Sequence, residues 1–346
     1  MEYVGIDLHK RDSQMCWLTE DGEVREQRIR TTAARFVAVF GGRPRARVLI
    51  EASTESEWVA QVIESVGHEV IVADPGYAPM YPRRGRRQKN DRRDAGALAI
   101  ANRAGTYRAV HRVSAAQRQV RAVLTVRDQL VAARTRLIAV VRALARGEGV
   151  RVPSCATEGV VPQVEAAGLP PALAATVAPL LDTVATLTAG IEASEARLAG
   201  LTADDPRVAA LQSAPSVGTI TAAAFVATLD EGGRFRDAGQ VAAYLGLVPR
   251  ERSSGETHRS GRITKAGSRR MRWLLVQAGW RVLRSKQAAA QPLRQWGTAI
   301  AARRGKAIAA VAIARRLARI LFALLRDGAT FDTDHEARRR AVRTAA

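Results

Sequence analysis

Four carboxylates lie at positions from which strands and a helix would bring them together. Asp7 and Glu51 each stand at the end of a short apolar segment, and Asp91 and Asp94 are three residues apart. On a helix, residues three apart share one face. Carboxylate oxygens are the ligands that Mg²⁺ prefers, and a pair of such ions can clamp the attacking and leaving oxygens of a phosphodiester. Any one of these acids alone is more often solvated or a helix cap, so the prediction of a magnesium site rests on the whole set.

A dense run of cations precedes and overlaps the last two acids. Seven of the eleven residues from 83 to 93 are Lys or Arg. Such a run is often a solvated loop, but carboxylates alone repel DNA, so cations beside them favour contact with phosphate. The residues expected to bind nucleic acid here are Arg83, Arg84, Arg86, Arg87, Lys89, Arg92 and Arg93.

A serine followed by glycine stands in a second basic block. We expect Ser254 on a flexible loop ahead of a cation-rich helix. A Ser-Gly pair alone is usually a turn, but neighbouring cations can stabilise charge on an attacked phosphate. Serine needs activation for such an attack. His258 is nearby, although a lone loop histidine is more often solvated, and the metal site is the other source of activation if the two domains meet. The cations of this block are Arg259, Arg262, Lys265, Arg269, Arg270 and Arg272.

The composition indicates a soluble protein that binds nucleic acid. The formal net charge of +21 attracts polyanions. We find no signal peptide and no run of 18 apolar residues to span a bilayer; the most apolar stretch, residues 307–325, is interrupted by arginines. Two cysteines are too few for a zinc site. Aromatic residues are only 5% of the chain, so contacts to phosphate and helix shape are expected rather than base stacking. The prediction is a cytoplasmic, nucleoid-associated protein with no membrane partner.

Residues 1–112 alternate strand-like and helix-like segments. Their order is three strands, helix, strand, helix, strand, helix, which is typical of a mixed sheet with helices on its faces. If the first and fourth strands are neighbours, Asp7 and Glu51 project side by side, and the last helix can lay the other two acids over them. The expected strands are 3–8, 13–19, 23–30, 47–50 and 69–73, and the expected helices are 32–40, 54–66 and 91–104.

Two segments within residues 113–205 repeat apolar residues in alternating steps of three and four. That spacing is a heptad seam. Two helices of an ordinary bundle would produce it, but we favour a coiled-coil hairpin that projects and oligomerises. The seam positions are Val123, Val126, Leu130, Ala133, Leu137, Val140 and Leu144, followed by Val177, Leu180, Val184, Leu187, Ile191, Ser194, Leu198 and Leu201.

Residues 206–335 are predicted to form a helical, strongly basic domain, with a basic tail at 336–346. Between positions 257 and 326 there are 17 Lys and Arg and no Asp or Glu. Such self-repulsion needs counter-charge, so this domain is expected to face phosphates. Because the basic stretch has no carboxylates to hold a metal, any metal chemistry must come from the first domain.

The acidic motifs resemble those of a known family. The element order in residues 1–112 is similar to the ribonuclease H-like fold of RuvC-type nucleases. The resemblance to the DEDD insertion-sequence transposases lies in Gly5-Ile6-Asp7, Ile50-Glu51-Ala52 and Lys89-Asn90-Asp91-Arg92-Arg93-Asp94-Ala95. The family commonly has Thr where Asn90 stands. The resemblance implies an α/β, ribonuclease H-like (RuvC-like) first domain, a coiled-coil middle, a helical transposase domain, and Mg²⁺ binding by Asp7, Glu51, Asp91 and Asp94.

The basic C-terminal block resembles the transposase domain of the same family. The similarity lies in residues 246–249, the Ser253-Ser254-Gly255 step, residues 263–267 and the arginine-rich helix after them. In the family the serine directly before glycine is the nucleophile, which implies Ser254, with Ser253 leaving a one-residue ambiguity. The family usually has Gly where Ser216 stands, in a turn that either presents backbone amides to phosphate or only joins two helices.

The resemblance covers nearly the whole chain and implies a DNA recombinase of an insertion sequence. Family members form covalent phosphoserine links to DNA and act as tetramers, with serine and acids thought to come from different subunits. They are guided by a structured noncoding (bridge) RNA that pairs with target and donor DNA. A covalent link conserves bond energy, so rejoining needs no ATP.

Two alternative functions remain. A metal-dependent RuvC-like nuclease or junction resolvase would use only the acids and form no covalent intermediate. A noncatalytic nucleic-acid scaffold would lose no activity on Asp94→Asn.

Overall fold

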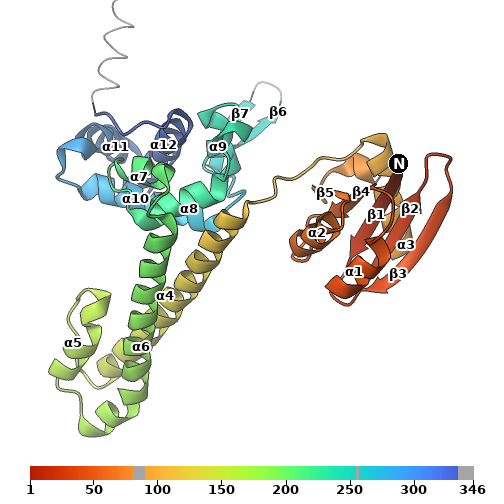
Figure 1. Ribbon diagram of the computed structural model, residues 1–346. Helices are drawn as coiled ribbons and strands as arrows, with labels where there is room; N and C mark the ends of the chain where they lie inside the picture. The colour runs from red at the N-terminus through yellow and green to blue at the C-terminus, as the bar shows by residue number, and fades with distance from the viewer. Residues whose placement is uncertain (82–89, 255–256, 334–346) are drawn as a thin grey trace, which may run out of the picture. The chain divides into compact units, whose positions relative to one another are not determined.

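The computed structural model describes residues 1–81, 90–254 and 257–333. The chain divides into two compact units, Met1–Arg112 and Val113–Ala346, coloured red to orange and yellow to blue in Figure 1. Each unit has its own core, and the two are described separately.

The first unit is built on a five-stranded mixed sheet. Its strands are β1 (Glu2–Leu8), β2 (Asp12–Leu18), β3 (Val24–Arg30), β4 (Ala46–Glu51) and β5 (Glu69–Ala73), and its helices are α1 (Ala33–Phe40), α2 (Ser56–Ser65), the short η1 (Ala78–Met80) and α3 (Asp91–Ala104). The strand order is β3-β2-β1-β4-β5, with β1 antiparallel to β2 and parallel to β4. The predicted mixed sheet is confirmed, and each strand lies within one residue of its expected bounds.

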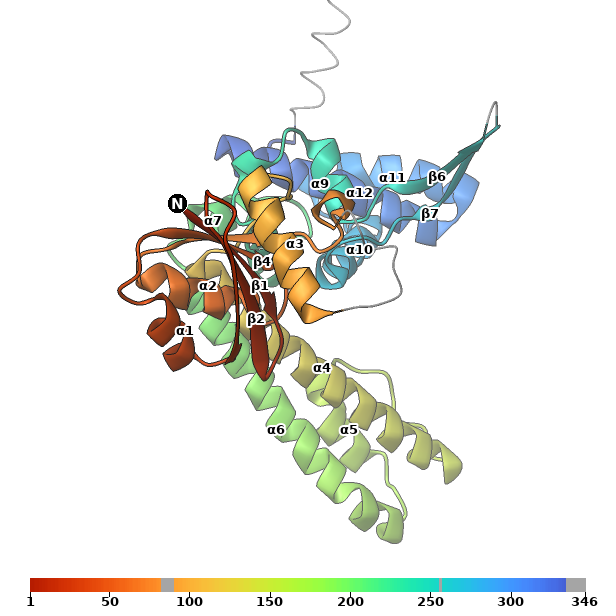
Figure 2. The same cartoon turned by 90° about the vertical axis from the view of Figure 1, so that its right-hand side faces the viewer.

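Helices cover both faces of this sheet. Side chains alternate along a strand, so Val4 and Ile6 of β1 point to one face, where they share a core with residues of α1 and α2. Gly5 and Asp7 point to the opposite face. That face is covered by α3, which packs against β1, β2 and β4 and lies across the strands in Figure 2. The acids on β1 and β4 are therefore on the side of the sheet that α3 occupies.

In its described residues, the second unit is helical apart from one two-stranded hairpin. Its elements are α4 (Ala115–Gly147), η2 (Thr157–Gly159), α5 (Val160–Ala166), α6 (Pro171–Thr202), α7 (Pro206–Gln212), α8 (Thr219–Leu229), η3 (Gly232–Arg234), α9 (Ala238–Tyr244), β6 (Pro249–Ser254), β7 (Thr257–Ile263), α10 (Arg269–Arg284), η4 (Ala288–Ala290), α11 (Gln291–Arg304) and α12 (Lys306–Asp327). The long helices α4 and α6 lie side by side (Figure 1). One end of this pair holds a small core with α5, and the other joins the main core around the almost entirely buried α8.

The predicted heptad seam of α4 is partly wrong: the fully buried positions lie one residue later, while Val123 and Leu137 of the predicted seam are partly buried against the two cores. The α4 side chains buried toward α6 and α5 include Ile138 and Val141, whereas Val126, Val140 and Leu144 of the predicted seam are 54%, 46% and 42% exposed. In α6 the prediction holds better, because the predicted positions Val177, Val184, Ile191 and Leu198 are all buried.

Polar residues in the true seam of α4 explain the error. Arg134 is only 6% exposed and donates to Thr188 Oγ1 at 3.2 Å and to Glu158 Oε1 at 3.4 Å. Arg127 donates to Glu195 Oε1 at 2.7 Å. Long arginine stems pack as apolar groups while their heads find partners. A search for apolar spacing passes over such positions and selects the more apolar stripe beside them.

The basic C-terminal region is not helical throughout, because residues 249–263 form the β6–β7 hairpin. The two strands are antiparallel, with Ser254 opposite Thr257; between 251 and 260 the backbone alone is described, without 255 and 256. The expectation that Ser254 lies on a loop is therefore wrong, since it is the last residue of β6. The strand sequences are rich in Arg and Ser and show no apolar alternation, the signal that a strand prediction depends on.

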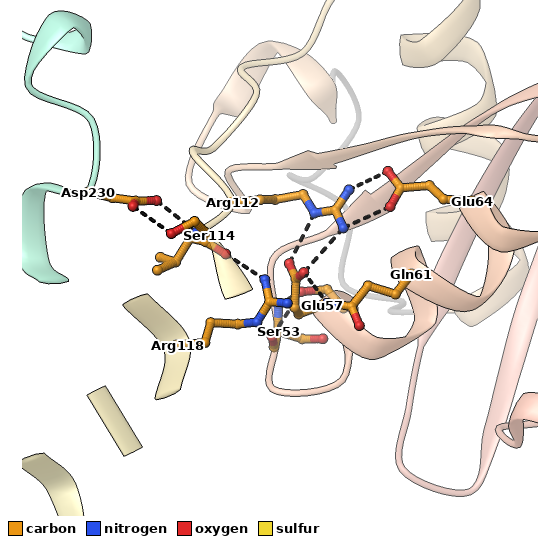
Figure 3. Close-up of polar contacts among 10 residues, drawn as sticks. Ser53, Glu57, Gln61, Glu64, Arg112, Ser114, Arg118 and Asp230 are labelled. Carbon is orange, nitrogen blue, oxygen red and sulfur yellow. Dashed lines mark hydrogen bonds and ion pairs between the residues drawn. The ribbon is translucent and has the colours of Figure 1, made fainter. Parts of the chain in front are cut away.

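Hydrogen-bonded clusters flank the boundary between the units (Figure 3). On the side of the first unit, Arg112 donates from Nε to Glu57 at 3.0 Å and from Nη2 to Glu64 at 3.0 Å, both on α2. On the side of the second unit, the backbone N and the Oγ of Ser114 each donate to Asp230 at 2.8 Å. Arg112 is thus bonded to α2 within the first unit, and Ser114 is bonded to Asp230 within the second.

One described helix, α6, has the length and composition of a membrane span. This differs from the expectation that residues 307–325 are the most apolar stretch. Its seam packs on α4 in the structure, and 17% of its apolar window is buried.

Candidate active site

The sheet register brings the first two acids together. β1 and β4 are parallel neighbours with Ile6 paired to Ile50. Asp7 and Glu51 each follow that pair by one residue, so they lie beside one another on the α3 face. The sequence-based condition that the first and fourth strands be neighbours is confirmed.

Close packing lets α3 approach these strands. A Cβ atom at Gly5 would lie 2.2 Å from the carbonyl oxygen of Ala95 and 2.3 Å from the nitrogen of Ala99. Asn102 is fully buried, and its Nδ2 donates to the carbonyl oxygens of Val4 at 3.1 Å and Arg47 at 2.7 Å. The backbone of α3 therefore packs directly against β1. The Asn102 side chain also links α3 to backbone carbonyl groups of β1 and β4.

The N-terminus of α3 carries the other two acids. Asn90 caps the helix, since its side chain accepts a hydrogen bond from Arg92 N at 3.0 Å. It thus fulfils the capping role that a threonine would serve at this position. Asp91 and Asp94 lie in the first turn, where the helix dipole favours negative charge.

The four carboxylates act on one another electrostatically. Burial raises the pKa of the Asp7 carboxyl above its ordinary value; His9 opposes this shift, and the charges of Asp91, Asp94 and Glu51 add to it. The charges of the three other predicted acids therefore all act on the Asp7 carboxyl. A bound cation would relieve the repulsion among them.

A histidine that sequence reasoning missed stands among the acids. Nε2 of His9 lies 3.4 Å from Asp7 Oδ2 and 3.5 Å from Asp91 Oδ1. Ligand atoms of these three residues all lie within 4.8 Å of one another. The sequence offered one signal for it, because His9 follows Asp7 by two residues. Residues two apart along a strand face the same side of the sheet.

A tyrosine that sequence reasoning also missed contacts Glu51. Tyr81 follows η1, is 6% exposed, and donates its hydroxyl hydrogen bond to Glu51 Oε1. No local pattern marked it, because the two residues are 30 apart in the chain.

A polar pocket borders Asp91 at the edge of the sheet. It is formed where β2 and β3 meet the start of α3, and of the four predicted acids Asp91 lines it. Its lining residues are Gln14, Glu26, Gln27, Arg28, Asn90, Asp91 and Arg92.

The cations expected near the acids are only partly within the described chain. Arg92 is exposed and lies 3.4 Å from Glu26, and Arg93 is exposed. Five others lie outside the described residues: Arg83, Arg84, Arg86, Arg87 and Lys89.

Close backbone packing forms the base of the β6–β7 hairpin, whose first strand ends in Ser254. Gly246 and Gly267 have φ of 69° and 68°, and a Cβ on Gly267 would lie 2.0 Å from the carbonyl oxygen of Tyr244. Arg272 donates from Nη1 to the carbonyl oxygens of Ala266 and of Gly267, the latter at 3.0 Å. The Gly-Leu-Val-Pro segment and the segment 263–267 thus meet to hold the hairpin.

The remaining cations of the basic block differ in their surroundings. Arg262, Lys265 and Arg269 are exposed, and only the backbone is described for Arg259. Arg270 instead contacts α4, donating to Asp128 Oδ2 and to Thr125 Oγ1. The structure therefore gives Arg270 and Arg272 partners within the protein.

The turn at Ser216 has the backbone that suits glycine. Ser216 has φ of 63°, the left-handed conformation that side chains disfavour. Glycine adopts this conformation without steric cost. The backbone of this turn is therefore consistent with the glycine that the family usually has where Ser216 stands.

Family models match both units. A transposase model of the DEDD, IS110 type matches residues 4–147, and the model described as "Transposase IS116/IS110/IS902 family" matches residues 208–294. The first match includes the four acids, and the second includes Ser254 and α10.

Curated relatives match along almost the full length. A probable family 20 transposase of Pseudomonas aeruginosa is 32% identical, with 93% of this chain and 96% of that protein covered. The transposase for insertion sequence element IS1111A of Coxiella burnetii is 29% identical, covering 94% and 90%. The transposase for insertion sequence element IS1328 of Yersinia enterocolitica is 27% identical, covering 95% and 98%.

Proposed function

Because the chain belongs to the IS116/IS110/IS902 family of insertion-sequence transposases, we propose that it is a DNA recombinase that cuts and rejoins strands through a covalent phosphoserine link. Its acids would bind Mg²⁺, and Ser254 would be the nucleophile. It would act on element ends and target DNA in the bacterial cytoplasm, at the nucleoid.

The topology of the first unit supports a ribonuclease H-like, RuvC-like assignment. The strand order is β3-β2-β1-β4-β5, in which an antiparallel three-stranded part is extended by two parallel strands. The acids lie on the central pair of this sheet and on the helix that crosses it.

The single observation that carries the proposal is the burial of Asp7 among other carboxylates. Asp7 is 8% exposed, and its Oδ2 atom has no hydrogen-bond donor among the described residues. A buried carboxylate oxygen without a donor costs free energy unless a positive charge compensates it. Asp7 and Asp91 lie where a divalent cation would supply that charge, and Glu51 and Asp94, whose charges act on Asp7, would complete its ligands. When bound, Mg²⁺ would stabilise the charge on an attacked phosphodiester and on the leaving oxygen.

The serine step exchanges one phosphoester for another. The Ser254 Oγ loses its proton and attacks phosphorus, an Oγ–P bond forms, and the bond from phosphorus to one strand oxygen breaks. The released strand end takes up a proton. Because bond energy is conserved in the phosphoserine, the reverse attack by a strand hydroxyl rejoins DNA without ATP.

Exposed cations support contact with nucleic acid. Arg93 in the first unit and Arg262, Lys265 and Arg269 in the second are exposed. Together with the net charge of +21, they suit phosphate contacts that hold duplexes by shape. We propose that sequence is read instead by a structured noncoding RNA encoded by the element, the bridge RNA, which pairs with both DNA partners.

Exposed apolar side chains on α4 support an oligomer, which we propose is a tetramer. Val126, Val140 and Leu144 repeat with heptad-compatible spacing and are 54%, 46% and 42% exposed. A second copy of the chain is the partner that such a stripe suits.

A trapping assay tests the proposed mechanism. The protein is incubated with Mg²⁺, element-end and target DNA, and RNA transcribed from the element flanks. Products are separated on a denaturing gel with and without protease treatment, beside Ser254→Ala, Ser253→Ala and Asp94→Asn. We expect a protein–DNA adduct in the wild type that is absent from Ser254→Ala, retained in Ser253→Ala, and dependent on the RNA.

The same assay separates the alternatives. DNA cleavage without an adduct, unaffected by Ser254→Ala and lost in Asp94→Asn, would identify a metal-dependent nuclease or resolvase. Binding of DNA with no cleavage by any of the proteins would favour a noncatalytic scaffold.

A further inference from the structure

The imidazole of His9 stands between two carboxylates from different elements. Its Nε2 atom lies 3.4 Å from Asp7 Oδ2, at the end of β1, and 3.5 Å from Asp91 Oδ1, at the start of α3. Adjacent ligand atoms on an octahedral ion with bonds of about 2.1 Å lie about 3 Å apart. A small inward movement of the three side chains would therefore give the spacing of ligands around one ion.

The surroundings hold His9 at this position. Thr31 Oγ1 donates to the carbonyl oxygen of His9 at 2.7 Å, and Ser13 Oγ lies 2.7 Å from the same Thr31 oxygen. This hydrogen-bond chain connects the segment after β1 to β2 and to the residue that follows β3. The side chain of His9 is 46% exposed, so the imidazole can turn while its backbone is held.

The carboxylate oxygen nearest to His9 points to a cation as the missing partner. Asp7 Oδ2 is buried and has no hydrogen-bond donor among the described residues, although Nε2 of His9 is close to it. Asp91 Oδ1 lies 3.5 Å from the same nitrogen. The group of three thus converges on one point from a strand end, a loop and a helix N-terminus.

We propose that His9 is a direct ligand, through Nε2, of the cation that Asp7 and Asp91 hold, and that the site binds Mn²⁺ in preference to Mg²⁺. The inference rests on the metal site of the proposed function and adds a nitrogen donor to its acids. Imidazole is a common ligand of transition metals, whereas Mg²⁺ favours oxygen ligands alone. One nitrogen among carboxylates therefore shifts the preference toward Mn²⁺ without excluding Mg²⁺.

A protonated His9 paired with the acids is the competing arrangement. The two are mutually exclusive at Nε2, because a nitrogen that binds metal cannot carry a proton. Electron paramagnetic resonance of bound Mn²⁺ distinguishes them, since a directly bonded nitrogen gives an electron spin-echo modulation and an ion pair does not.

The experiment uses the full-length protein loaded with Mn²⁺ in the absence of DNA. We expect nitrogen modulation in the wild type, its loss in His9→Ala, and its persistence in the control His111→Asn, which alters another imidazole of the same unit. Labelling histidine with ¹⁵N should change the modulation pattern. Bound Mn²⁺ with no nitrogen coupling, or coupling that persists in His9→Ala, would overturn the proposal.

Metal titrations supply the second readout. His9→Ala is expected to weaken Mn²⁺ binding by about tenfold, in the range seen when a residue supporting a metal site is lost, and to change Mg²⁺ binding much less. His9→Asp restores an oxygen donor, so it should recover binding but not the nitrogen signal. An equal loss for both ions would contradict the nitrogen role.

The outcomes also separate this inference from the proposed function. If Mn²⁺ binds the wild type and is lost in Asp7→Asn, but no nitrogen is coupled, only the role of His9 fails. If neither Mn²⁺ nor Mg²⁺ binds in a manner sensitive to Asp7→Asn, the metal site of the proposed function fails together with it.

Discussion

The hydroxyl group of Tyr81 donates a hydrogen bond to Oε1 of Glu51. Tyr81 is buried and follows η1, whereas Glu51 ends β4, the neighbour of the central strand β1. The carboxylate of Glu51 is thus oriented from a segment that leads directly into the cationic run at 83–93. A displacement of Tyr81 would therefore alter the orientation of the Glu51 carboxylate through this hydrogen bond.

Removing the Tyr81 hydroxyl should impair the acids without unfolding the protein. Tyr81→Phe keeps the ring and loses the donor, so Glu51 is less well oriented. We expect DNA cleavage to fall by about 10- to 100-fold, as for other residues that orient metal ligands. Tyr107→Phe is the matched control, because its hydroxyl accepts from Arg47 instead. Equal cleavage by both variants would argue against an orienting role.

Adding a methyl group at Gly5 should separate α3 from β1. The new Cβ would lie 2.2 Å from Ala95 O, so helix or strand must shift. We expect Gly5→Ala to lower the free energy of unfolding by about 1–3 kcal/mol and to abolish cleavage. Gly96→Ala is the control on the same helix: its nearest neighbour, Cys16 Sγ, is 4.0 Å away, so it should be neutral or stabilising by up to about 1 kcal/mol. Chemical denaturation measures both, and a tolerated Gly5→Ala would show that α3 does not need this close contact.

The stability of the metal-free protein should depend on the charge of Asp7. Burial raises the pKa of Asp7 above 3.8, with His9 opposing the shift. A raised folded-state pKa means that the folded protein holds this proton more tightly than the unfolded chain. The contribution of this proton to folding stability is therefore complete at a pH below the pKa of Asp7 in the unfolded chain. It is lost as pH rises through the higher pKa of the folded protein.

Asp7→Asn carries no charge at any pH, which gives the measurement. At neutral pH with a chelator, we expect a higher Tm for Asp7→Asn than for the wild type, a difference that shrinks toward pH 4 and when Mg²⁺ is added. Cleavage should be lost in the same variant. A Tm lower than that of the wild type at neutral pH would contradict the prediction.

Neighbouring arginines on α10 should have separable effects. Arg269 is exposed, whereas Arg270 is paired with Asp128 and Thr125 on α4. We expect Arg269→Ala to weaken DNA binding and to reduce the slope of log affinity against log salt by about 0.9, with unchanged Tm. Arg270→Ala should instead cost about 1 kcal/mol of stability. Salt titrations of DNA binding and thermal unfolding test the pair, and identical salt slopes for the two variants would refute the distinction.

The strands and the acids of the first unit could be predicted from sequence because their signals are local. β1, β4 and β5 are short, largely apolar segments, and Asp7 and Glu51 stand near the ends of β1 and β4. Tyr81 could not be found in this way, and the only local signal for His9 was its two-residue spacing from Asp7. Glu51 and Tyr81 are 30 residues apart, and the role of His9 appears only when α3 is folded over β1.

The errors in the second unit have a common physical cause. Apolar spacing cannot reveal a seam that buries Arg134 or a hairpin made of polar residues, because these are held by arginine stems, ion pairs and backbone hydrogen bonds. Seam positions in α6 were predicted better, since its buried face is more uniformly apolar.

The α4–α6 pair has a separate small core at one end and the main core at the other. With 33 residues at about 1.5 Å each, α4 is about 50 Å long. Inserting or deleting seven residues in both helices would keep the seam in phase and move the tip by about 10 Å. The length of the α4–α6 pair can therefore change in steps of seven residues, while the core at each end keeps its packing.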